Sequence, residues 1–483
     1  MGMFILVLLI LLILVILFLL LRTLRCRDNS EPVQPDAPLQ AELMPAADNL
    51  IRAIQYQTIS GGDDSCFEAF GRWLEETYPL IHTHLSFTKG EGWTRIYCWE
   101  GFDPSLEPVL LTAHQDVVPP GDPEDWDHPP FSGYRSDGYI WGRGAVDMKV
   151  QLVSLMESLE LLLRRGFTPK RTVWIVLGHD EEIGGTGARA AASFFASRGI
   201  TFFLLLDEGG CVTHGVMPGV DKPIAMVGTA EKGYADIELE AHSGGGHASM
   251  PPRRTSLGLL SQAVSTLEHR QHPLRLTPVP RKLLKTIAPH LPLIQRLAVV
   301  NLWLFRPFIL RMLSKTPPGN AMLRTTAAPT MAKASDAPNV LSTESWATVN
   351  YRMLQGDQEA DVIEHVKRHM KDKPITVRSL RVEEASRITD TASPAFQLVS
   401  RTISQVFPDA ITAPYLMTGG TDSRKYEHLC SGICRFSPYR LTQADIDLMH
   451  SPNERISEEN LLSSLQFYLQ LMNNLGLSRD SRS

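Results

Sequence analysis

The feature that most constrains the fold is a set of short apolar runs that end in acidic or histidine side chains. One such run, residues 173–177 (VWIVL), is followed by GHDEEIGGTG, residues 178–187. An uninterrupted apolar run of this length predicts a strand that is buried on both faces. The acids after it, Asp180, Glu181 and Glu182, repel one another, so folding alone does not explain them. They indicate either a bound cation or a solvated loop.

Runs of this kind alternate with amphipathic helical patterns from about residue 41 onwards. This alternation predicts an α/β fold with a mainly parallel sheet flanked by helices. In such sheets ligands bind outside the carboxyl ends of the strands. The expected strands are 109–112, 173–177 and 201–206, and the expected helices are 46–57, 67–77, 148–165 and 187–198.

The pattern changes in the second half of the chain. Residues 234–241 and 345–353 alternate between apolar and polar side chains, as half-exposed strands do. We therefore expect an α+β module, residues 235–372, to be inserted into a main domain made of residues 45–234 and 373–483. The last elements expected in the main domain are a helix at 395–406, a strand at 433–436 and a helix at 457–476.

The N-terminus carries eighteen consecutive apolar residues, 4–21, which is at the short end of what spans a bilayer. No small-residue cleavage site follows, so residues 1–27 are predicted to be an uncleaved anchor, with a cleaved signal peptide as the alternative. Residues 28–44 form a polar, Pro-rich linker. Both an anchor and a signal peptide would direct the chain to the secretory pathway. The protein would then be either secreted or anchored in a membrane with a lumenal or extracellular catalytic domain.

Two observations point to the opposite topology. Arg22, Arg25 and Arg27 follow the apolar run, and the positive-inside rule would keep the body of the chain in the cytosol. The sequence also has no Asn-x-Ser/Thr acceptor site. The orientation of the predicted span is therefore left open.

The composition excludes some classes of function. The net charge is −6 over 483 residues, and no basic tract indicates nucleic-acid binding. The six cysteines show neither zinc-ribbon spacing nor the density of a disulfide-rich scaffold.

Other predicted strand and helix ends carry further acids and histidines. The carboxyl ends of parallel strands share one edge of a sheet, so we expect these side chains to meet the acids of residues 180–182. The residues are His114 and Asp116 in LLTAHQDVVP, Asp147 in WGRGAVDMK, Asp207 and Glu208 in FFLLLDEGG, and His450 in DLMHSPNE.

So many charges in one cleft cannot all be buried without partners. Zinc accepts both imidazole nitrogen and carboxylate oxygen. Two zinc ions about 4 Å apart that share a bridging carboxylate would neutralise the charge and activate a water molecule. The sequence therefore predicts a two-zinc site, and Mn or Co could occupy a site so rich in carboxylates.

The motifs AHQDVVP, GRGAVDMK, GHDEEIGG and DEGG, followed by a late histidine, resemble the di-zinc aminoacylase and carboxypeptidase family in content and order. The resemblance covers residues 45–476. It implies a zinc-exopeptidase-like fold with an inserted lid or dimerisation domain, and a homodimer. Within the family the chain is most similar to the branch that hydrolyses and forms N-fatty-acyl amino acids, and the carboxypeptidase S branch is the near alternative.

The resemblance also implies roles for the clustered residues. Asp116 would orient a histidine ligand, Glu181 would be the general base, and Asp147 would bridge the two ions. In the DEGG motif Glu208 aligns with the remaining ligand, with Asp207 as the alternative. The implied metal ligands are His114, Asp147, Glu182, Glu208 or Asp207, and His450.

Four further residues match the family's substrate-binding positions. His247 in SGGGHASMPP would polarise the scissile carbonyl, often across a dimer interface. Arg352 in VNYRM and Arg424 in GGTDSR would bind the substrate carboxylate, which suits the bidentate fork of arginine. Asn339 in APNVLS corresponds to the lid asparagine.

These residues together predict a di-zinc amidohydrolase whose substrate is an N-fatty-acyl amino acid, with fatty acid and amino acid as products and reversal possible. One alternative is a membrane-anchored carboxypeptidase that cleaves dipeptides or C-terminal residues. Another is a non-catalytic binding protein on the same fold. The apolar segment 291–313 is expected either to pack internally or in a dimer, or to contact an acyl chain, a membrane or a lipid particle.

Overall fold

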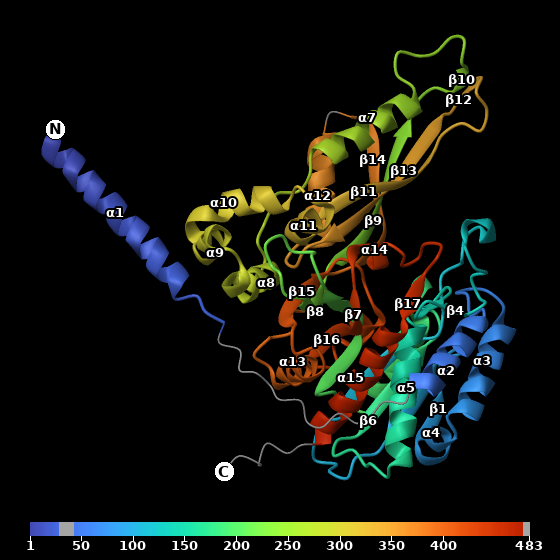
Figure 1. Ribbon diagram of the computed structural model, residues 1–483. Helices are drawn as coiled ribbons and strands as arrows, with labels where there is room; N and C mark the ends of the chain where they lie inside the picture. The colour runs from blue at the N-terminus through green and yellow to red at the C-terminus, as the bar shows by residue number, and fades with distance from the viewer. Residues whose placement is uncertain (29–42, 372, 477–483) are drawn as a thin grey trace.

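The computed structural model describes residues 1–28, 43–371 and 373–476 (Figure 1). Its centre is an eight-stranded sheet in the order β1-β2-β6-β3-β7-β16-β8-β15. The strands are β1 (Ser86–Lys89), β2 (Arg95–Trp99), β3 (Val109–His114), β6 (Val173–Gly178), β7 (Leu204–Thr213), β8 (Ile224–Glu231), β15 (Ile411–Met417) and β16 (Ile433–Leu441).

The expectation of a mainly parallel sheet is confirmed. Strands β6, β3, β7 and β16 are parallel neighbours, as are β8 and β15. The remaining pairs, β1–β2, β2–β6, β16–β8 and β7–β8, are antiparallel. The predicted strand at 109–112 extends to His114, so the first expected ligand is the last residue of its strand.

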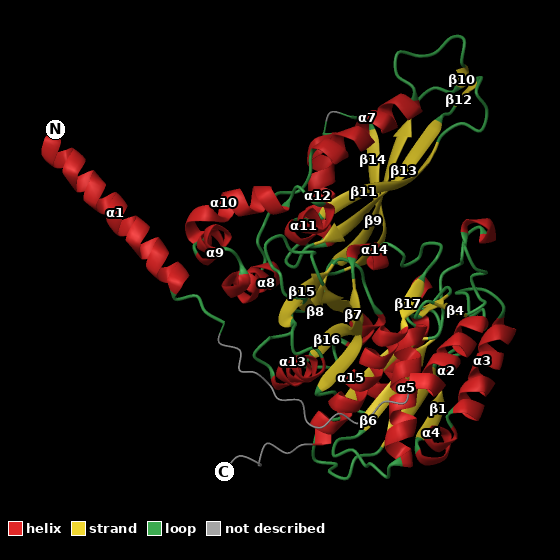
Figure 2. Cartoon of the chain, in the orientation of Figure 1, coloured by secondary structure: helices red, strands yellow, loops and turns green. Residues whose placement is uncertain are grey.

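Helices cover both faces of this sheet, and Figure 2 shows those that cover one of them. Successive side chains of β3 point to opposite faces, and both faces are apolar: Val109 and Leu111 pack into one core, whereas Leu110 packs into another. The first face is covered by α2 (Leu43–Gln55), α3 (Asp64–Thr77), α4 (Pro79–His84), α5 (Lys149–Arg164), α13 (Pro394–Val406) and α15 (Glu458–Gly476). The second face is covered by α6 (Thr186–Ser197) and η4 (Asp422–Tyr426).

A three-stranded sheet stands beside the main one and joins distant parts of the chain. Its middle strand is β5 (Tyr139–Trp141), which pairs with β4 (Tyr134–Ser136) and with β17 (Arg455–Ser457). This pairing holds the segment before Asp147 against the segment after His450. Short helices nearby are η1 (Pro123–Asp125), η2 (Glu181–Ile183) and α14 (Gln443–Ile446).

A second sheet contains the strands of the expected insertion. Its order is β11-β13-β9-β14, and α7 (Ser256–His269) and α12 (Glu359–Met370) pack on one face. A small pair, β10 (Gly246–His247) and β12 (Val340–Leu341), lies at its far end (Figure 1). The four strands are β9 (Gly233–His242), β11 (Thr326–Lys333), β13 (Glu344–Met353) and β14 (Ile375–Glu383).

The expected module boundary at residue 372 needs correction, because β14 follows it and pairs with β9. The second sheet therefore continues to residue 383.

A further difference concerns the helices between the strands of the second sheet. α8 (Pro278–Ile287), η3 (Ala288–His290), α9 (Leu293–Val300), α10 (Leu302–Leu313) and α11 (Pro317–Leu323) lie within the expected module, but their apolar side chains pack mainly against β8 and β15 of the main sheet.

The N-terminal apolar run forms α1 (Gly2–Leu24), which projects from the folded body (Figure 1). It is the single helix of the described residues that is by itself long and apolar enough to cross a membrane, and 6% of its most apolar window is buried. Signal sequences near an N-terminus also satisfy this criterion of length and apolar composition. The expected linker 28–44 lies almost wholly outside the described residues.

Candidate metal centre

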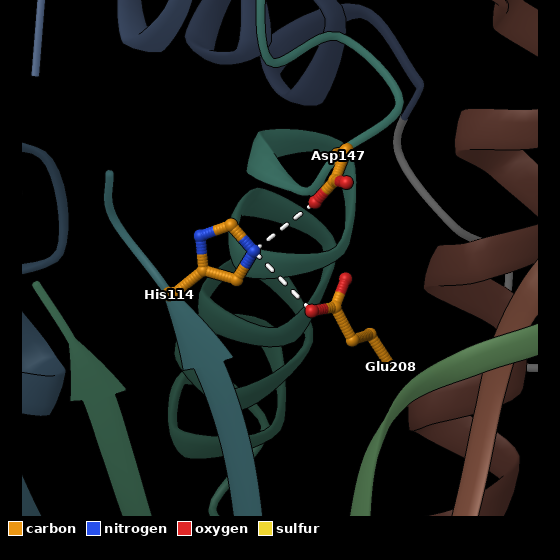
Figure 3. Close-up of side chains that lie close together, drawn as sticks. All are labelled: His114, Asp147 and Glu208. Carbon is orange, nitrogen blue, oxygen red and sulfur yellow. Dashed lines mark hydrogen bonds and ion pairs between the residues drawn. The ribbon is translucent and has the colours of Figure 1, made fainter. Parts of the chain in front are cut away.

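Three potential metal ligands meet where β3 ends (Figure 3). His114 Nε2 lies 3.1 Å from Asp147 Oδ1 and 3.3 Å from Glu208 Oε1. Asp147 stands just before α5, and Glu208 lies on β7. One ligand atom from each residue falls within a 4.8 Å cluster, so a single cation could contact all three.

A second group shares Asp147 with the first. His450 Nε2 lies 3.1 Å from Asp147 Oδ2 and 3.3 Å from Glu182 Oε1. His450 adopts a φ of 61°, a left-handed conformation that is uncommon for a residue with a side chain and often marks a functional site. The two oxygens of Asp147 therefore face two different histidines, which is the arrangement of a carboxylate that bridges two cations.

The structure distinguishes the two acids of the DEGG motif. The expected strand ended before them, but β7 continues to Thr213. Its pairing with β16 skips from Asp207 to Gly210, and this bulge turns Glu208 towards His114. The Asp207 carboxylate instead accepts hydrogen bonds from the backbone N–H of Ser423, at 2.8 Å, and of Glu208, at 3.0 Å. Glu208 is thus the acid in ligand position.

The acids at 180–182 divide into two roles. Asp180 accepts hydrogen bonds from the backbone N–H groups of Thr186 and Gly187, at 2.6 and 3.0 Å, and from the Thr186 hydroxyl. These donors belong to the first turn of α6, whose N–H groups lack partners within the helix. Asp180 is therefore a helix-capping residue, whereas Glu181 and Glu182 face the cluster.

Asp116 connects the two parts of the site. Its carboxylate accepts hydrogen bonds from the backbone N–H of Glu181 and Glu182, both at 3.2 Å, and from the Ser60 hydroxyl at 2.6 Å. His114 Nδ1 lies 2.9 Å from the backbone oxygen of Asp116 and 3.3 Å from its carboxylate. Both oxygens hold the ring so that Nε2 points at the cluster, which is how partners of metal-bound histidines act.

A buried ion pair that the sequence did not reveal supports Asp147. Arg143 Nη1 lies 2.6 Å from Glu454 Oε2, and both side chains are buried. The other oxygen of Glu454 accepts hydrogen bonds from the backbone N–H of Val146 and Asp147, at 2.8 and 3.2 Å. Only the proximity of Glu454 to His450 in DLMHSPNE hinted at such a role.

The electrostatics of the cluster favour a bound cation. Burial, and then the neighbouring Asp147, raise the pKa of Glu208 to about 8. Burial, and then Glu208, raise the pKa of Glu181 well above its usual value. Glu182 Oε1 is buried and accepts no hydrogen bond from the described residues. A divalent cation would stabilise these carboxylates in their charged form, so the residues fit a two-metal site.

A cavity of about 380 Å³ opens beside this cluster. Both Glu181 and Glu182 line it, together with several cationic side chains from the second sheet and from η4. The cations are Arg352 on β13, Arg381 on β14, and Arg424 and Lys425 on η4. The cavity is therefore suited to the anionic end of a ligand.

The two arginines singled out in the sequence differ in their surroundings. Arg424 Nε lies 3.0 Å from Oε2 of the buried Glu231, and its other nitrogens meet Lys232 O and Glu383. Arg352 lies over the Tyr234 ring, 4.7 Å from its centroid, and its Nε donates to Asn350 Oδ1 at 3.2 Å. Within the described residues no carboxylate forms an ion pair with Arg352, so it is the cation that remains available to a ligand.

The chain matches the family model of the peptidase family M20/M25/M40 over residues 110–474. The chain belongs to this family. Peptidases of the M20 family are metal-dependent hydrolases of amide bonds, so the chain is an enzyme of this kind, and the alternative of a non-catalytic binding protein is set aside.

Two relatives illustrate the range within the family. The chain is 39% identical over 439 residues to probable carboxypeptidase S-like 2 of Dictyostelium discoideum, covering 89% of this chain and 84% of the relative. It is 36% identical over 433 residues to N-fatty-acyl-amino acid synthase/hydrolase PM20D1 of Homo sapiens, covering 87% and 86%. The overall sequence identities are so similar that they do not show which of these two kinds of M20 enzyme the chain resembles more.

A solved structure supports the fold. The M20 family metallo-carboxypeptidase Sso-CP2 from Sulfolobus solfataricus superimposes with a TM-score of 0.68 at 16% identity, covering 89% of this chain and 99% of that chain. The expected α/β architecture is thereby confirmed.

Two expected site residues lie away from this M20 centre. His247 is exposed on β10, and its Nδ1 accepts a hydrogen bond of 2.7 Å from the Ser249 hydroxyl. The backbone oxygen of Asn339 accepts a hydrogen bond of 3.0 Å from Ala248 N–H. Both residues lie at the far end of the second sheet (Figure 1), so within one chain they do not join the cluster.

The sequence did not single out Tyr234, Arg381 or Glu383, which also line the cavity. Tyr234 lies beneath both Arg352 and Arg381, and Glu383 meets Arg381 at 2.8 Å and Lys425 at 3.3 Å. Tyr234 is separated by more than a hundred residues from both of its arginine partners. Contacts between such distant residues do not appear in local sequence motifs. For Arg381 and Glu383 the available signal was the alternation in ITVRSLRVE, residues 375–383, which indicates their strand β14.

Proposed function

We propose that this M20 enzyme hydrolyses N-fatty-acyl amino acids, and forms them in the reverse direction, at a two-metal centre of the residues described above. The supporting observation is the cavity, in which Arg352 has no acidic partner among the described residues, while Glu181 and Glu182 of the cluster line the same cavity. A substrate with a free carboxylate would place its amide bond between these groups.

The cavity also argues against substrates with a free ammonium group. Its remaining acids are Glu383, which is paired with cations, and Asp422. Burial, and then Asp207, raise the pKa of Asp422 well above its usual value, which disfavours the charged form of this carboxyl. An acylated nitrogen is therefore a better match than an α-ammonium group, which would need an unpaired carboxylate.

The proposed assignment of ligands follows the two groups. His114 and Glu208 would hold one ion, His450 and Glu182 the other, and Asp147 both. Histidine nitrogen and carboxylate oxygen are donors that suit zinc. Two such ions would supply the Lewis acidity that lowers the pKa of water and polarises a carbonyl.

The chain's own residues would then move the proton. The carboxylate of Glu181 takes a proton from the attacking water and delivers it to the leaving amine nitrogen. Arg352 binds the substrate carboxylate through its free fork, and Asp116 orients His114 and fixes the backbone of Glu181. The products are a fatty acid and a free amino acid, and no covalent intermediate with the protein forms.

His247 and Asn339 enter this proposal only through a homodimer. They lie too far from their own chain's cluster to act there, so a second chain would have to bring that end of its second sheet to the cavity. His247 would then stabilise the oxyanion that develops on the carbonyl. α1 would anchor the enzyme in the secretory pathway, close to lipid substrates.

The deciding experiment uses the purified full-length chain with N-oleoyl-phenylalanine and, separately, Gly-Leu. Wild-type protein is compared with Glu181→Gln, and bound metal is counted in both. We expect release of oleate by the wild type, and no activity with unchanged metal content in the variant. Wild-type protein that retains its metal but does not cleave N-oleoyl-phenylalanine would refute the lipid-amide assignment.

A carboxypeptidase is the second candidate, and the 39% identity to a probable carboxypeptidase S-like protein favours it. It would use the same metal centre and the same carboxylate-binding arginine. Cleavage of Gly-Leu without cleavage of N-oleoyl-phenylalanine is the result that would select it.

A further inference from the structure

The base of the apolar helix α1 is fastened to the folded body. Asn301, between α9 and α10, donates from Nδ2 to Leu19 O at 3.4 Å and to Thr23 Oγ1 at 3.3 Å. Thr23 and Asn301 are both fully buried. Arg22 Nη2 donates to Val300 O at 3.3 Å. The last turns of α1 and the α9–α10 corner therefore form one unit.

Helices α9 and α10 present an apolar face to the solvent beside this junction. They meet at a bend of 114°. Together they are long and apolar enough to form a broken membrane span or a re-entrant loop. On α10, Ile309 and Leu310 are buried against the body. On its other side Leu304, Phe308 and Met312 follow one another at intervals of four residues and are all exposed, which is one stripe of the helix.

We define the docking face as this stripe together with its exposed apolar neighbours. Its six residues are Leu293, Ile294, Trp303, Leu304, Phe308 and Met312. They belong to α9 and α10, the helices of the body that lie next to α1 (Figure 1). Several large apolar side chains exposed on two neighbouring helices are typical of contact with a partner or a membrane.

Cationic groups lie at the edge of the docking face. A cavity of about 530 Å³ between α1, α8, α9 and α10 is lined by the cations Arg22, Arg281 and Lys285 and by apolar residues, including Val299 and Trp303. Among the described residues no acid lines this cavity, although the chain as a whole has a net charge of −6. The local combination of cations and apolar groups complements anionic lipid.

We propose that the docking face lies in the interface of an anionic bilayer, the same bilayer in which α1 is inserted, and that the three cations contact the lipid phosphates. The junction at Thr23 and Asn301 decides between a bilayer and a second protein. A span that ends at residue 24 places the membrane surface beside its last turn, and the α9–α10 corner is hydrogen-bonded to that turn. The docking face therefore meets lipid before it can meet another protein.

This inference goes beyond the proposed reaction, because it concerns where the body of the enzyme sits. It also connects the lipid surface to the site. α11 follows α10 directly, and Lys232 Nζ donates to Ala321 O and Arg324 O at its end, both at 2.9 Å. Lys232 adjoins Glu231, which holds Arg424 in the cavity wall.

The test places an environment-sensitive fluorescent amino acid at position 308 of the full-length chain, reconstituted into vesicles of phosphatidylcholine and phosphatidylglycerol. The matched control carries it at position 257, because Leu257 on α7 is also exposed, at 51% against 63% for Phe308. Interfacial helices bury their apolar side about 5–10 Å into the lipid, so we expect brominated lipid to quench the probe at 308 about threefold more strongly than at 257. Equal quenching at the two positions would overturn the proposal, as would a blue-shifted but unquenched probe at 308, which signifies burial against protein.

A second arm tests the charges. The double variant Arg281→Glu and Lys285→Glu should reduce quenching at 308 in vesicles that contain phosphatidylglycerol and leave it unchanged in pure phosphatidylcholine. No effect of the double variant in either vesicle would refute the role of the cations. Quenching reports position alone, so its outcome is independent of whether N-oleoyl-phenylalanine is cleaved.

Discussion

The carboxylate of Asp116 lies 3.3 Å from Nδ1 of His114, and the same carboxylate accepts the backbone N–H groups of Glu181 and Glu182. One buried side chain thus fixes a histidine of the cluster and the backbone of the segment that carries the proposed base. The hydrogen bond from Ser60 completes its set of partners. Asp116 therefore couples the orientation of one potential ligand to the position of another.

This coupling predicts the effect of Asp116→Ala. We expect activity to fall by about 10–100-fold, the usual cost of losing a partner of a ligating histidine, together with weaker metal binding at His114. Ser60→Ala is the matched control, because it removes one donor to Asp116 and leaves both contacts to the site in place. Equal losses in the two variants would show that Asp116 acts only through local folding.

The acids of the DEGG motif lead to a second prediction. Glu208→Gln should reduce the metal content from about two ions per chain to about one, because each ion of a two-metal site depends on its own terminal ligands. Asp207→Asn should keep both ions and lower the stability, since Asp207 accepts the N–H of Ser423. Metal analysis and urea unfolding of both variants distinguish the two residues. Loss of metal in Asp207→Asn alone would reverse the assignment.

The acids at 180–182 predict a contrast in stability. Asp180→Ala removes the acceptor at the start of α6 and should cost about 1–2 kcal/mol in the free energy of unfolding, within the range for helix caps. Glu181→Gln should leave the unfolding midpoint unchanged or raise it, because it removes a buried acid next to Glu208. Thermal and urea unfolding of the metal-loaded proteins measure both effects.

Much of the site follows from sequence because it depends on strand ends. The expected runs at 109–112 and 173–177 became β3 and β6, and parallel pairing brought His114 level with Gly178 at one edge. By contrast, Glu208 reaches the site through a bulge in β7, and local patterns do not reveal a bulge without its pairing partner. The position of Asp147 is likewise set by Glu454, 307 residues away.

Arg424 shows a different limit of prediction from sequence. A motif identified the residue but not its partner, and Glu231 lies 193 residues away. Two arginines, Arg424 and Arg435, meet that buried carboxylate, so its charge is already balanced. Whether an arginine is free to bind a ligand depends on such partners, and only the structure supplies them.

The difference between the two cavity arginines can be tested directly. Arg352→Ala should raise the KM for a substrate with a free carboxylate and have little effect on the same substrate with a carboxamide, because the lost contact is to the carboxylate. Arg424→Ala should affect both substrates alike and destabilise the fold by about 1–3 kcal/mol, since it removes a partner of the buried Glu231. A carboxylate-specific loss in Arg424→Ala, with none in Arg352→Ala, would exchange their roles.

A pair of stacked histidines predicts how stability depends on pH. His272 is 8% exposed, its ring lies 3.8 Å from that of His365, and its Nε2 has no hydrogen-bond partner within the described residues. Burial, and then His365, lower the pKa of His272 to about 4 from the usual value of 6.5. The unfolded chain therefore binds a proton between these values that the folded chain does not.

The sign of the effect follows from this difference in proton binding. The contribution of His272 to stability is fully present above pH 6.5 and is lost as the pH falls towards 4, because protonation favours the unfolded state throughout that interval. His272→Phe keeps a ring at this position and removes the titrating group. We expect its urea midpoint to fall less between pH 6.5 and 4 than that of the wild type. His214→Phe, at an exposed position, is the control and should follow the wild type. An equal fall in all three proteins would show that other groups govern the acid sensitivity.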